Sequence, residues 1–215
     1  MSGQTPIVID PTDAASAQRA LDAAIEALQA GGVVLIPTDT VYGLACLPSH
    51  PDAVARVYAM KDRPHDVRLP IIVADSQHAE RELPLRWTPA ARALADAFWP
   101  GALTIVFGIE PSTVDWLADR DEAGLRAPAH PLVQDLARSV GPFLMTSANR
   151  HGGPSSPTVQ QILADLASPP ALTVDGGQLE VVSSTLVNTN LPEPAIEREG
   201  AIAAQRIAEV LSRAG

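Results

Sequence analysis

Short apolar runs alternate with helix-forming segments along almost the whole chain, and this alternation most constrains the fold. The segment 14–30 repeats apolar residues at helical spacing, and the run 33–36 follows it as a buried strand. Helices and strands that alternate in this way pack as layers, which predicts an α/β sheet covered by helices. The predicted helices are 14–30, 51–60, 89–98, 131–140, 158–166 and 201–213, and the predicted strands are 33–36, 69–74, 102–109, 124–127, 142–146, 171–174, 184–187 and 194–196.

The length of 215 residues fits one domain, with a motif-bearing core of about 15–200 and a C-terminal helix at 201–213. The single cysteine, Cys46, cannot form an intrachain disulfide. The first ten residues lack the basic and apolar regions of a signal peptide, and no apolar run approaches the roughly 20 residues of a membrane span. We therefore expect a soluble, cytoplasmic protein without membrane contact.

The net charge of −10 disfavours tight, nonspecific binding to nucleic acid, which normally requires a basic face. A local basic pocket remains compatible with this charge. The cations are unevenly distributed by type, with fourteen arginines and one lysine, Lys61. The position of that lysine is therefore of interest.

Polar residues cluster where several predicted strands end. The sequences PTDT at 37–40, TSAN at 146–149 and SST at 183–185 each adjoin an apolar run, and LRAPAH at 125–130 contains one. Ligands of α/β sheets bind at strand ends, so these clusters are candidates for one shared cleft. The alternative is that their serines, threonines and asparagines only form turns.

The sequence KDRPHDVRLP at 61–70 places Lys61 and Arg63 just after a helix that Pro64 should end. An ammonium and a guanidinium on such a loop can hold one anion, because arginine clamps phosphate oxygens in pairs and lysine adds a point charge. The alternative is that both cations only stabilise the helix C-terminus.

The sequence TSANRHGGPSSP offers Ser147 and Asn149 as donors beside a glycine-rich turn that could bind an anion through its backbone. The chain has neither a phosphate-binding GxxxxGK[ST] loop nor a GxSxG hydrolase motif. Its five histidines lack the spacing of a zinc site, and Cys46 suits the core better than a nucleophilic role.

These motifs together resemble the YrdC-like family of threonylcarbamoyl-AMP synthases, in the short form without an extra C-terminal domain. The similar stretches run from Gly31 to Gly200 in the family's order, and they are GGVVLIPTDTVYGLA, KDRP, LPIIV, FWPGALTIVF, LRAPAHP, TSAN, GGPS, SST and REG. The resemblance implies a twisted mixed sheet flanked by helices around a deep central cavity. It also implies a nucleotidyltransferase that makes threonylcarbamoyl-AMP and pyrophosphate from L-threonine, bicarbonate and ATP, for threonylcarbamoyl-adenosine in tRNA.

The resemblance assigns site residues by position. Lys61 and Arg63 would be catalytic and would bind the ATP phosphates. The threonine-binding residues would be Thr40, Thr38, Arg126 and Ser184, and the further ATP-binding residues would be Thr146, Ser147, Asn149, Ser155 and Arg198.

The resemblance also implies partners. Mg²⁺ would arrive with ATP and need no protein-built metal site. Proteins of the TsaD, TsaB and TsaE type would pass the threonylcarbamoyl group to tRNA, and direct tRNA binding by this chain would be weak or absent.

The chain departs from the family pattern at four positions. Asp39 stands where glutamate is common, Ala45 replaces a frequent glycine, His151 replaces a frequent serine, and Arg68 replaces a frequent proline. Three other readings remain open at this point: a YciO-like paralogue of uncertain activity, a non-catalytic RNA-binding module of the same fold, and a carbamoylating domain with another acceptor.

Overall fold

The apolar run near residue 35 forms strand β2 (Val34–Ile36), whose side chains alternate between two separate hydrophobic clusters. Leu35 packs into one cluster, whereas Val34 and Ile36 pack into the other. Successive side chains of a strand point to opposite faces, so both faces of the sheet are covered here. This explains why the run is apolar without alternation.

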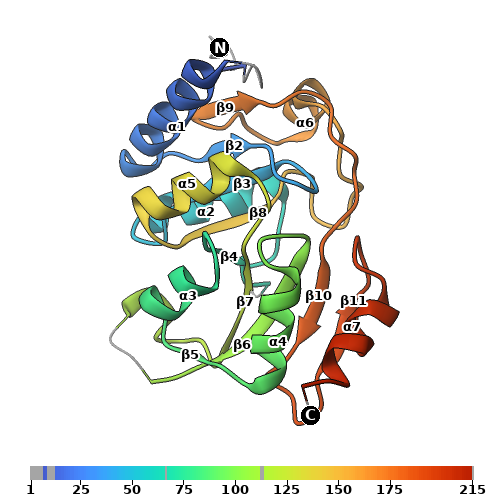
Figure 1. Ribbon diagram of the computed structural model, residues 1–215. Helices are drawn as coiled ribbons and strands as arrows, with labels where there is room; N and C mark the ends of the chain where they lie inside the picture. The colour runs from blue at the N-terminus through green and yellow to red at the C-terminus, as the bar shows by residue number, and fades with distance from the viewer. Residues whose placement is uncertain (1–6, 9–12, 66, 112–113, 215) are drawn as a thin grey trace.

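The computed structural model describes residues 7–8, 13–65, 67–111 and 114–214, and its strands form one mixed sheet (Figure 1). The strand order is β1-β9-β2-β3-β8-β4-β7-β6-β10-β11, with β5 paired to β6. The other strands are β1 (Ile7–Val8), β3 (Gly43–Cys46), β4 (Ile71–Ile72), β5 (Leu85–Arg86), β6 (Leu103–Ile109), β7 (Glu122–Arg126), β8 (Phe143–Ser147), β9 (Leu172–Asp175), β10 (Thr185–Asn188) and β11 (Ala195–Arg198).

Seven α-helices cover the sheet in the described part of the chain (Figure 1). Helices α1 and α5 pack on the face that holds Val34, and the other helices contribute to the cluster that holds Leu35. They are α1 (Ala14–Gln29), α2 (Pro51–Lys61), α3 (Ser76–Glu82), α4 (Pro89–Phe98), α5 (Pro131–Val140), α6 (Val159–Asp165) and α7 (Ala204–Leu211). The predicted α/β sheet flanked by helices is confirmed.

Helix starts follow the local sequence signals. Asp13 accepts a hydrogen bond from the backbone N–H of Ala15 at 2.9 Å and caps α1. Thr88 accepts one from the N–H of Ala91 at 3.0 Å, and Pro89 occupies the first turn of α4. Such caps satisfy N–H groups that have no partner inside a helix.

Strand β3 was not predicted, and it changes the interpretation of the polar stretch after β2. The chain reverses at 37–42 and returns as β3, with Ile36 opposite Gly43. Gly, Leu, Ala and Cys have little preference for strands, so no local signal marked β3. Pairing with β2 on one side and β8 on the other forms it instead.

Other boundaries also differ from the predictions. The predicted strand 69–74 is reduced to Ile71–Ile72, and α3, β5 and a short 3₁₀ helix at Asp115–Leu117 were missed. Helix α7 begins at Ala204 instead of 201. The residues before it pair with the start of β10, since the N–H groups of Ala201 and Ile202 donate to Ser183 O and the Thr185 hydroxyl.

No helix among the described residues is long and apolar enough to cross a membrane.

Substituting Phe107 by alanine tests the packing of β6. The Phe107 ring is fully buried, and its centroid lies 4.7 Å from that of Trp87 and 5.9 Å from that of Trp99. Phe107→Ala should lower the free energy of unfolding by about 3–5 kcal/mol, measured by urea denaturation. Leu191→Ala, at a side chain that is 43% exposed, should change it by less than about 0.5 kcal/mol. A loss below about 1 kcal/mol for Phe107→Ala would contradict this packing.

Candidate functional site

A cavity of about 490 Å³ lies where the β2–β3 turn, the strands β6, β7 and β8, and the segments flanking β10 converge. Seven of the predicted site residues line it, namely Thr38, Arg63, Arg126, Thr146, Ser147, Ser184 and Arg198. The other four, Lys61, Thr40, Asn149 and Ser155, are not among the described residues that line it. We call this cavity the arginine pocket, because Arg63, Arg68, Arg126 and Arg198 all line it.

Arg126 at the end of β7 occupies the centre of a polar cluster. Its Nη2 donates to Asp39 Oδ1 at 2.6 Å, its Nη1 to the Thr40 hydroxyl at 2.7 Å, and its Nε to Gly101 O at 3.1 Å. The residue is 7% exposed, and burial lowers the pKa of Arg126 while the charge of Asp39 raises it. The guanidinium is therefore fixed in one plane by three partners.

The Thr38 hydroxyl organises the turn between β2 and β3. It accepts hydrogen bonds from the N–H groups of Thr40 and Val41 at 3.1 and 3.2 Å and lies 2.6 Å from Val41 O. Such side chain to backbone bonds are typical of threonine in turns. Thr40 is held between Thr38 and Arg126, and it is 3% exposed. Thr38 thus lines the pocket, and Thr40 contacts two lining residues, Thr38 and Arg126.

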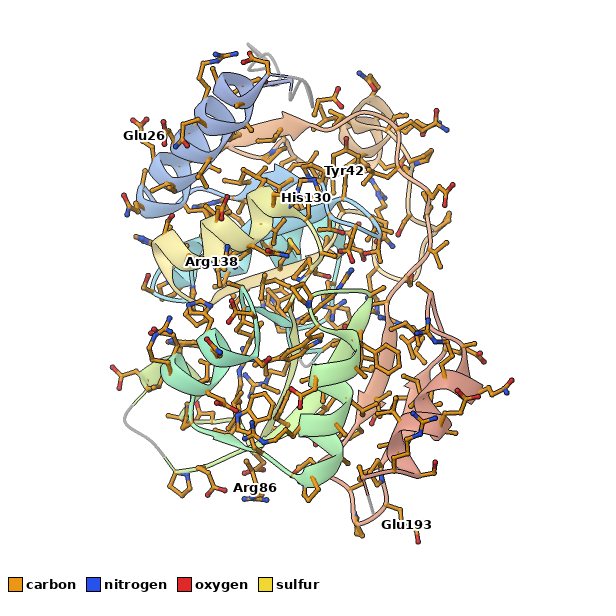
Figure 2. All side chains as sticks on the ribbon, in the orientation of Figure 1. Glu26, Tyr42, Arg86, His130, Arg138 and Glu193 are labelled. Carbon is orange, nitrogen blue, oxygen red and sulfur yellow. The ribbon has the colours of Figure 1, made fainter. Side chains whose placement is uncertain are left out.

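His130 precedes α5 and belongs to the same neighbourhood. Burial lowers the pKa of His130, and the charge of Asp39 raises it. Its Nδ1 is buried and has no hydrogen-bond partner among the described residues. Figure 2 labels His130 and Tyr42 in the upper half of the molecule, far from Arg86 and Glu193 at the lower end.

Lys61 closes α2 and points into the protein. Its Nζ donates to Ser147 O and Asn149 O, so the ammonium holds the TSAN turn. The residue is 1% exposed, and burial, with the nearby charge of Arg63, lowers the pKa of Lys61 to about 8. Lys61 is not among the described residues that line the pocket, and it contacts the lining residue Ser147 through that residue's carbonyl. The role of Lys61 as a catalytic, ATP-binding residue stays a prediction.

Arg63 lines the pocket. Its Nε donates to Val67 O at 3.1 Å and its Nη2 to Arg68 O at 3.2 Å. The same loop is held by Tyr58, whose hydroxyl donates to Val67 O at 3.2 Å. The backbone oxygens orient one edge of the guanidinium and leave Nη1 without a described partner.

Asn149 and Ser155 lie in the loop after β8. The Asn149 amide donates to Arg150 O at 2.9 Å and to Gly153 O at 2.6 Å, which fixes the loop. Its Oδ1 is buried without a described partner. Ser155 is partly buried in the same loop.

The opposite wall of the pocket joins β6 to β10 and β11. Ser184 Oγ lies 2.9 Å from the Thr104 hydroxyl, and Arg198 donates from Nε and Nη2 to Ser184 O at 3.1 and 3.0 Å. Thr104 was not predicted as a site residue. The available signal was a hydroxyl inside the otherwise apolar strand LTIVFGI.

Tyr42 and Glu122 also line the pocket and were not predicted to do so. Burial is the largest cause that raises the pKa of Tyr42 to about 12, so this hydroxyl is protonated at neutral pH. Glu122 is the only acidic residue among the described residues that line the pocket.

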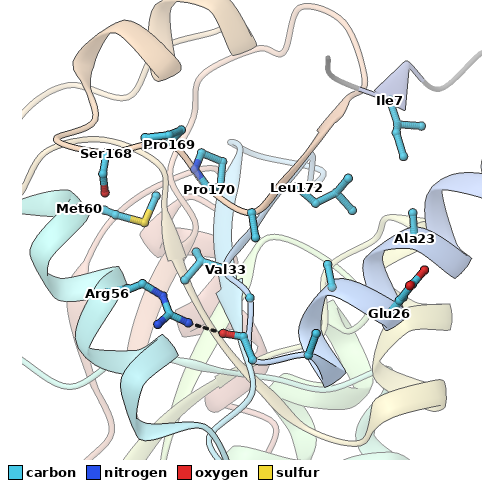
Figure 3. Close-up of a pocket in the computed structure, with 15 residues that line it drawn as sticks. Ile7, Ala23, Glu26, Val33, Arg56, Met60, Ser168, Pro169, Pro170 and Leu172 are labelled. Atoms are coloured by element: carbon cyan, nitrogen blue, oxygen red, sulfur yellow. Dashed lines mark hydrogen bonds between the residues drawn. The ribbon is translucent and has the colours of Figure 1, made fainter. Parts of the chain in front are cut away.

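A second cavity, of about 750 Å³, is larger but chemically poorer (Figure 3). It lies between α1, the turn at 31–33 and the segment 168–172, and most of its lining is apolar. Its charged residues are Glu26 and Arg56, and Arg56 Nη2 donates to Gly31 O. The arginine pocket therefore offers the better candidate site.

No group of three or more His, Cys, Asp or Glu side chains placed to hold a metal ion occurs among the described residues.

The buried lysine makes stability depend on pH. Because the pKa of Lys61 falls from 10.5 to about 8 on folding, the unfolded chain binds more protons between these pH values. The free energy of unfolding should then rise with pH across this window, by about 3 kcal/mol from Lys61 at 1.4 kcal/mol per unit. Urea denaturation of wild type and Lys61→Met at pH 8 and pH 10.5 should show wild type gaining relative to the variant. A difference that stays constant with pH would contradict the shifted pKa.

Comparisons with known proteins agree with the motifs. The Sua5/YciO/YrdC family model, described as Telomere recombination, matches residues 26–200. A Mycobacterium tuberculosis protein, named provisionally as a threonylcarbamoyl-AMP synthase, is 36% identical over 204 residues, which cover 94% of each chain. The Bacillus subtilis threonylcarbamoyl-AMP synthase is 37% identical over 191 residues, 86% of this chain and 54% of that protein.

Solved structures show the same relationship. The crystal structure of P. abyssi Sua5 with L-threonine matches with a TM-score of 0.85 and 28% identity, over 97% of this chain and 61% of that chain. E. coli YciO matches with a TM-score of 0.80 at 24% identity, over 96% of this chain and 100% of that one, which supports the fold alone. The chain thus spans about three fifths of the Sua5 chain and most of the shorter relatives. It belongs to the Sua5/YciO/YrdC family, as its motifs predicted.

Proposed function

We propose that the chain is an L-threonylcarbamoyladenylate synthase, a nucleotidyltransferase that uses ATP, L-threonine and bicarbonate. The observation that carries the proposal is the arginine pocket itself, with four arginines in a chain whose net charge is −10. Such a concentration of guanidinium groups suits a substrate with several negative charges, such as ATP. The names of the relatives supply the identity of the reaction.

In the proposed reaction, the threonine nitrogen attacks the carbon of bicarbonate, and a carbamate forms with loss of water. A carbamate oxygen then attacks the α-phosphorus of ATP, and the bond to the β-phosphate oxygen breaks, releasing pyrophosphate. Several anions must come together, so the protein contributes position and positive charge. Mg²⁺ would accompany ATP as part of the substrate.

Arg126 is suited to hold the threonine carboxylate. A guanidinium has five N–H donors, and Asp39, Thr40 and Gly101 engage three of them. One donor on each terminal nitrogen remains without a described partner, and two such donors match the two oxygens of a carboxylate. The related Sua5 crystal structure contains L-threonine, which supports threonine as a substrate.

The other arginines are suited to phosphate oxygens. Arg63 is oriented by Val67 O and Arg68 O, and Arg198 by Ser184 O, so each keeps its Nη1 donors available in the described structure. Donors fixed before the substrate arrives stabilise developing charge without reorganisation. Thr146 and Ser147 also line the pocket, and Lys61 donates to the Ser147 carbonyl.

The product would pass to other proteins that modify tRNA, of the TsaD, TsaB and TsaE type. Direct tRNA binding by this chain would be weak, because the net charge of −10 opposes the phosphate backbone.

A product assay tests the proposed function directly. The protein, incubated with ATP, Mg²⁺, bicarbonate and each amino acid separately, should form an acyl-adenylate with threonine, detected by mass spectrometry together with pyrophosphate. Isotopically labelled bicarbonate should shift the mass of the adenylate. If threonine gives no adenylate above the reaction without amino acid, the proposal is wrong.

Arg63→Ala tests the phosphate-binding assignment. Losing this fixed donor should lower kcat/KM for ATP by about a hundredfold, equivalent to about 3 kcal/mol of transition-state stabilisation. Arg19→Ala is the matched control, because the Arg19 side chain is 67% exposed and, among the described residues, pairs with Asp13 on the surface. Pyrophosphate release measured for both should fall for Arg63→Ala alone, and equal rates in the two variants would exclude a phosphate role for Arg63.

A further inference from the structure

The segment between β9 and β10 has to cross most of the sheet. Six strands lie between these two in the sheet order, so seven spacings of about 4.8 Å, or about 34 Å, would separate them in a flat sheet. Ten residue steps from Asp175 to Thr185 reach at most about 36 Å. Twisting of the sheet shortens the path, and a turn between Glu180 and Val182 takes up part of the length. We call residues 176–184 the crossover. In Figure 1 it is the orange chain that descends from β9 to β10.

The far end of the crossover forms part of the arginine pocket. Ser183 and Ser184 line the pocket, and Ser184 contacts Thr104 and Arg198. Only ten residue steps join Asp175 to Thr185, so the place where the crossover starts limits the positions open to its end. The position at which the crossover begins therefore bears on the position of Ser184.

Tyr42 holds the start of the crossover. Its hydroxyl accepts a hydrogen bond from the N–H of Gly176 at 2.9 Å and lies 2.6 Å from Gly177 O and 3.2 Å from Asp175 Oδ1, both possible acceptors of its proton. Asp175 Oδ1 also accepts from the N–H of Gly177 at 2.9 Å. One phenol thus joins the β2–β3 turn to three successive residues that lie more than 130 positions away.

The backbone at this junction is closely packed. A Cβ atom on Gly176 would lie 2.8 Å from Cγ of Pro37, so only glycine fits without displacing one of the two segments. Gly177 has φ +82°, which glycine adopts without strain. Both glycines are therefore required by the contact between the turn and the crossover.

We propose that Tyr42 is a positioning residue that fixes the start of the crossover and thereby sets where Ser184 stands in the pocket. The part that concerns substrate rests on the proposed function and on the family resemblance, which assigns Ser184 to the threonine site. The anchoring part rests on the contacts of the folded chain alone.

Two variants separate anchoring from direct contact. Tyr42→Phe removes the hydroxyl from a residue that lines the pocket, whereas Gly176→Ala displaces the crossover from a residue outside the lining. Amide hydrogen exchange followed by mass spectrometry should show residues 178–184 exchanging about fivefold faster in both. The threonine KM should rise about fivefold in both, while kcat stays within about twofold.

Thr88→Ala is the control for a general loss of stability, because it removes the cap of α4 at a residue that does not line the pocket. It should lower the melting temperature without changing either readout. Unchanged exchange at 178–184 in Tyr42→Phe would overturn the anchoring role. Faster exchange with an unchanged threonine KM would overturn the link to Ser184. If the wild type forms no adenylate, the proposed function fails, and exchange at 178–184 still decides whether Tyr42 anchors the crossover.

Discussion

The ion pair between Arg126 and Asp39 is the interaction on which the pocket depends. It joins β7 to the turn between β2 and β3, and the bond from Nε to Gly101 O adds the turn before β6. A buried guanidinium is costly without partners, so these three segments must assemble around it together. Thr104 lies opposite Arg126 in the β6–β7 register, which brings the wall containing Ser184 to the same point.

The other arginines of the pocket are likewise held by hydrogen bonds, here to main-chain oxygens. Arg63 bonds to Val67 O and Arg68 O, Arg68 to Asp119 O, and Arg198 to Ser184 O. Each carbonyl contact orients a guanidinium without neutralising it. Among these four arginines, only Arg126 has a carboxylate partner in the described residues. Positive potential is thereby concentrated at one place in an acidic protein, where an anionic substrate benefits most.

The sequence predicted the layers and much of the pocket, because those features leave local signals. Helix α4 was marked by Thr88 and Pro89, and β6 by its apolar run. Strand β3 carries no such signal and depends on its neighbours in the sheet. The direction of the Lys61 side chain depends on the exact rotation of α2. The partners of the Tyr42 hydroxyl lie more than 130 positions away in the sequence. Spacing alone could not reveal either orientation.

The carbonyl contacts of the arginines have an evolutionary consequence. A main-chain oxygen is present whatever residue occupies the position, so point substitutions at Val67, Asp119 or Ser184 leave the acceptor in place. The guanidiniums therefore keep these main-chain acceptors when the side chain at such a position changes.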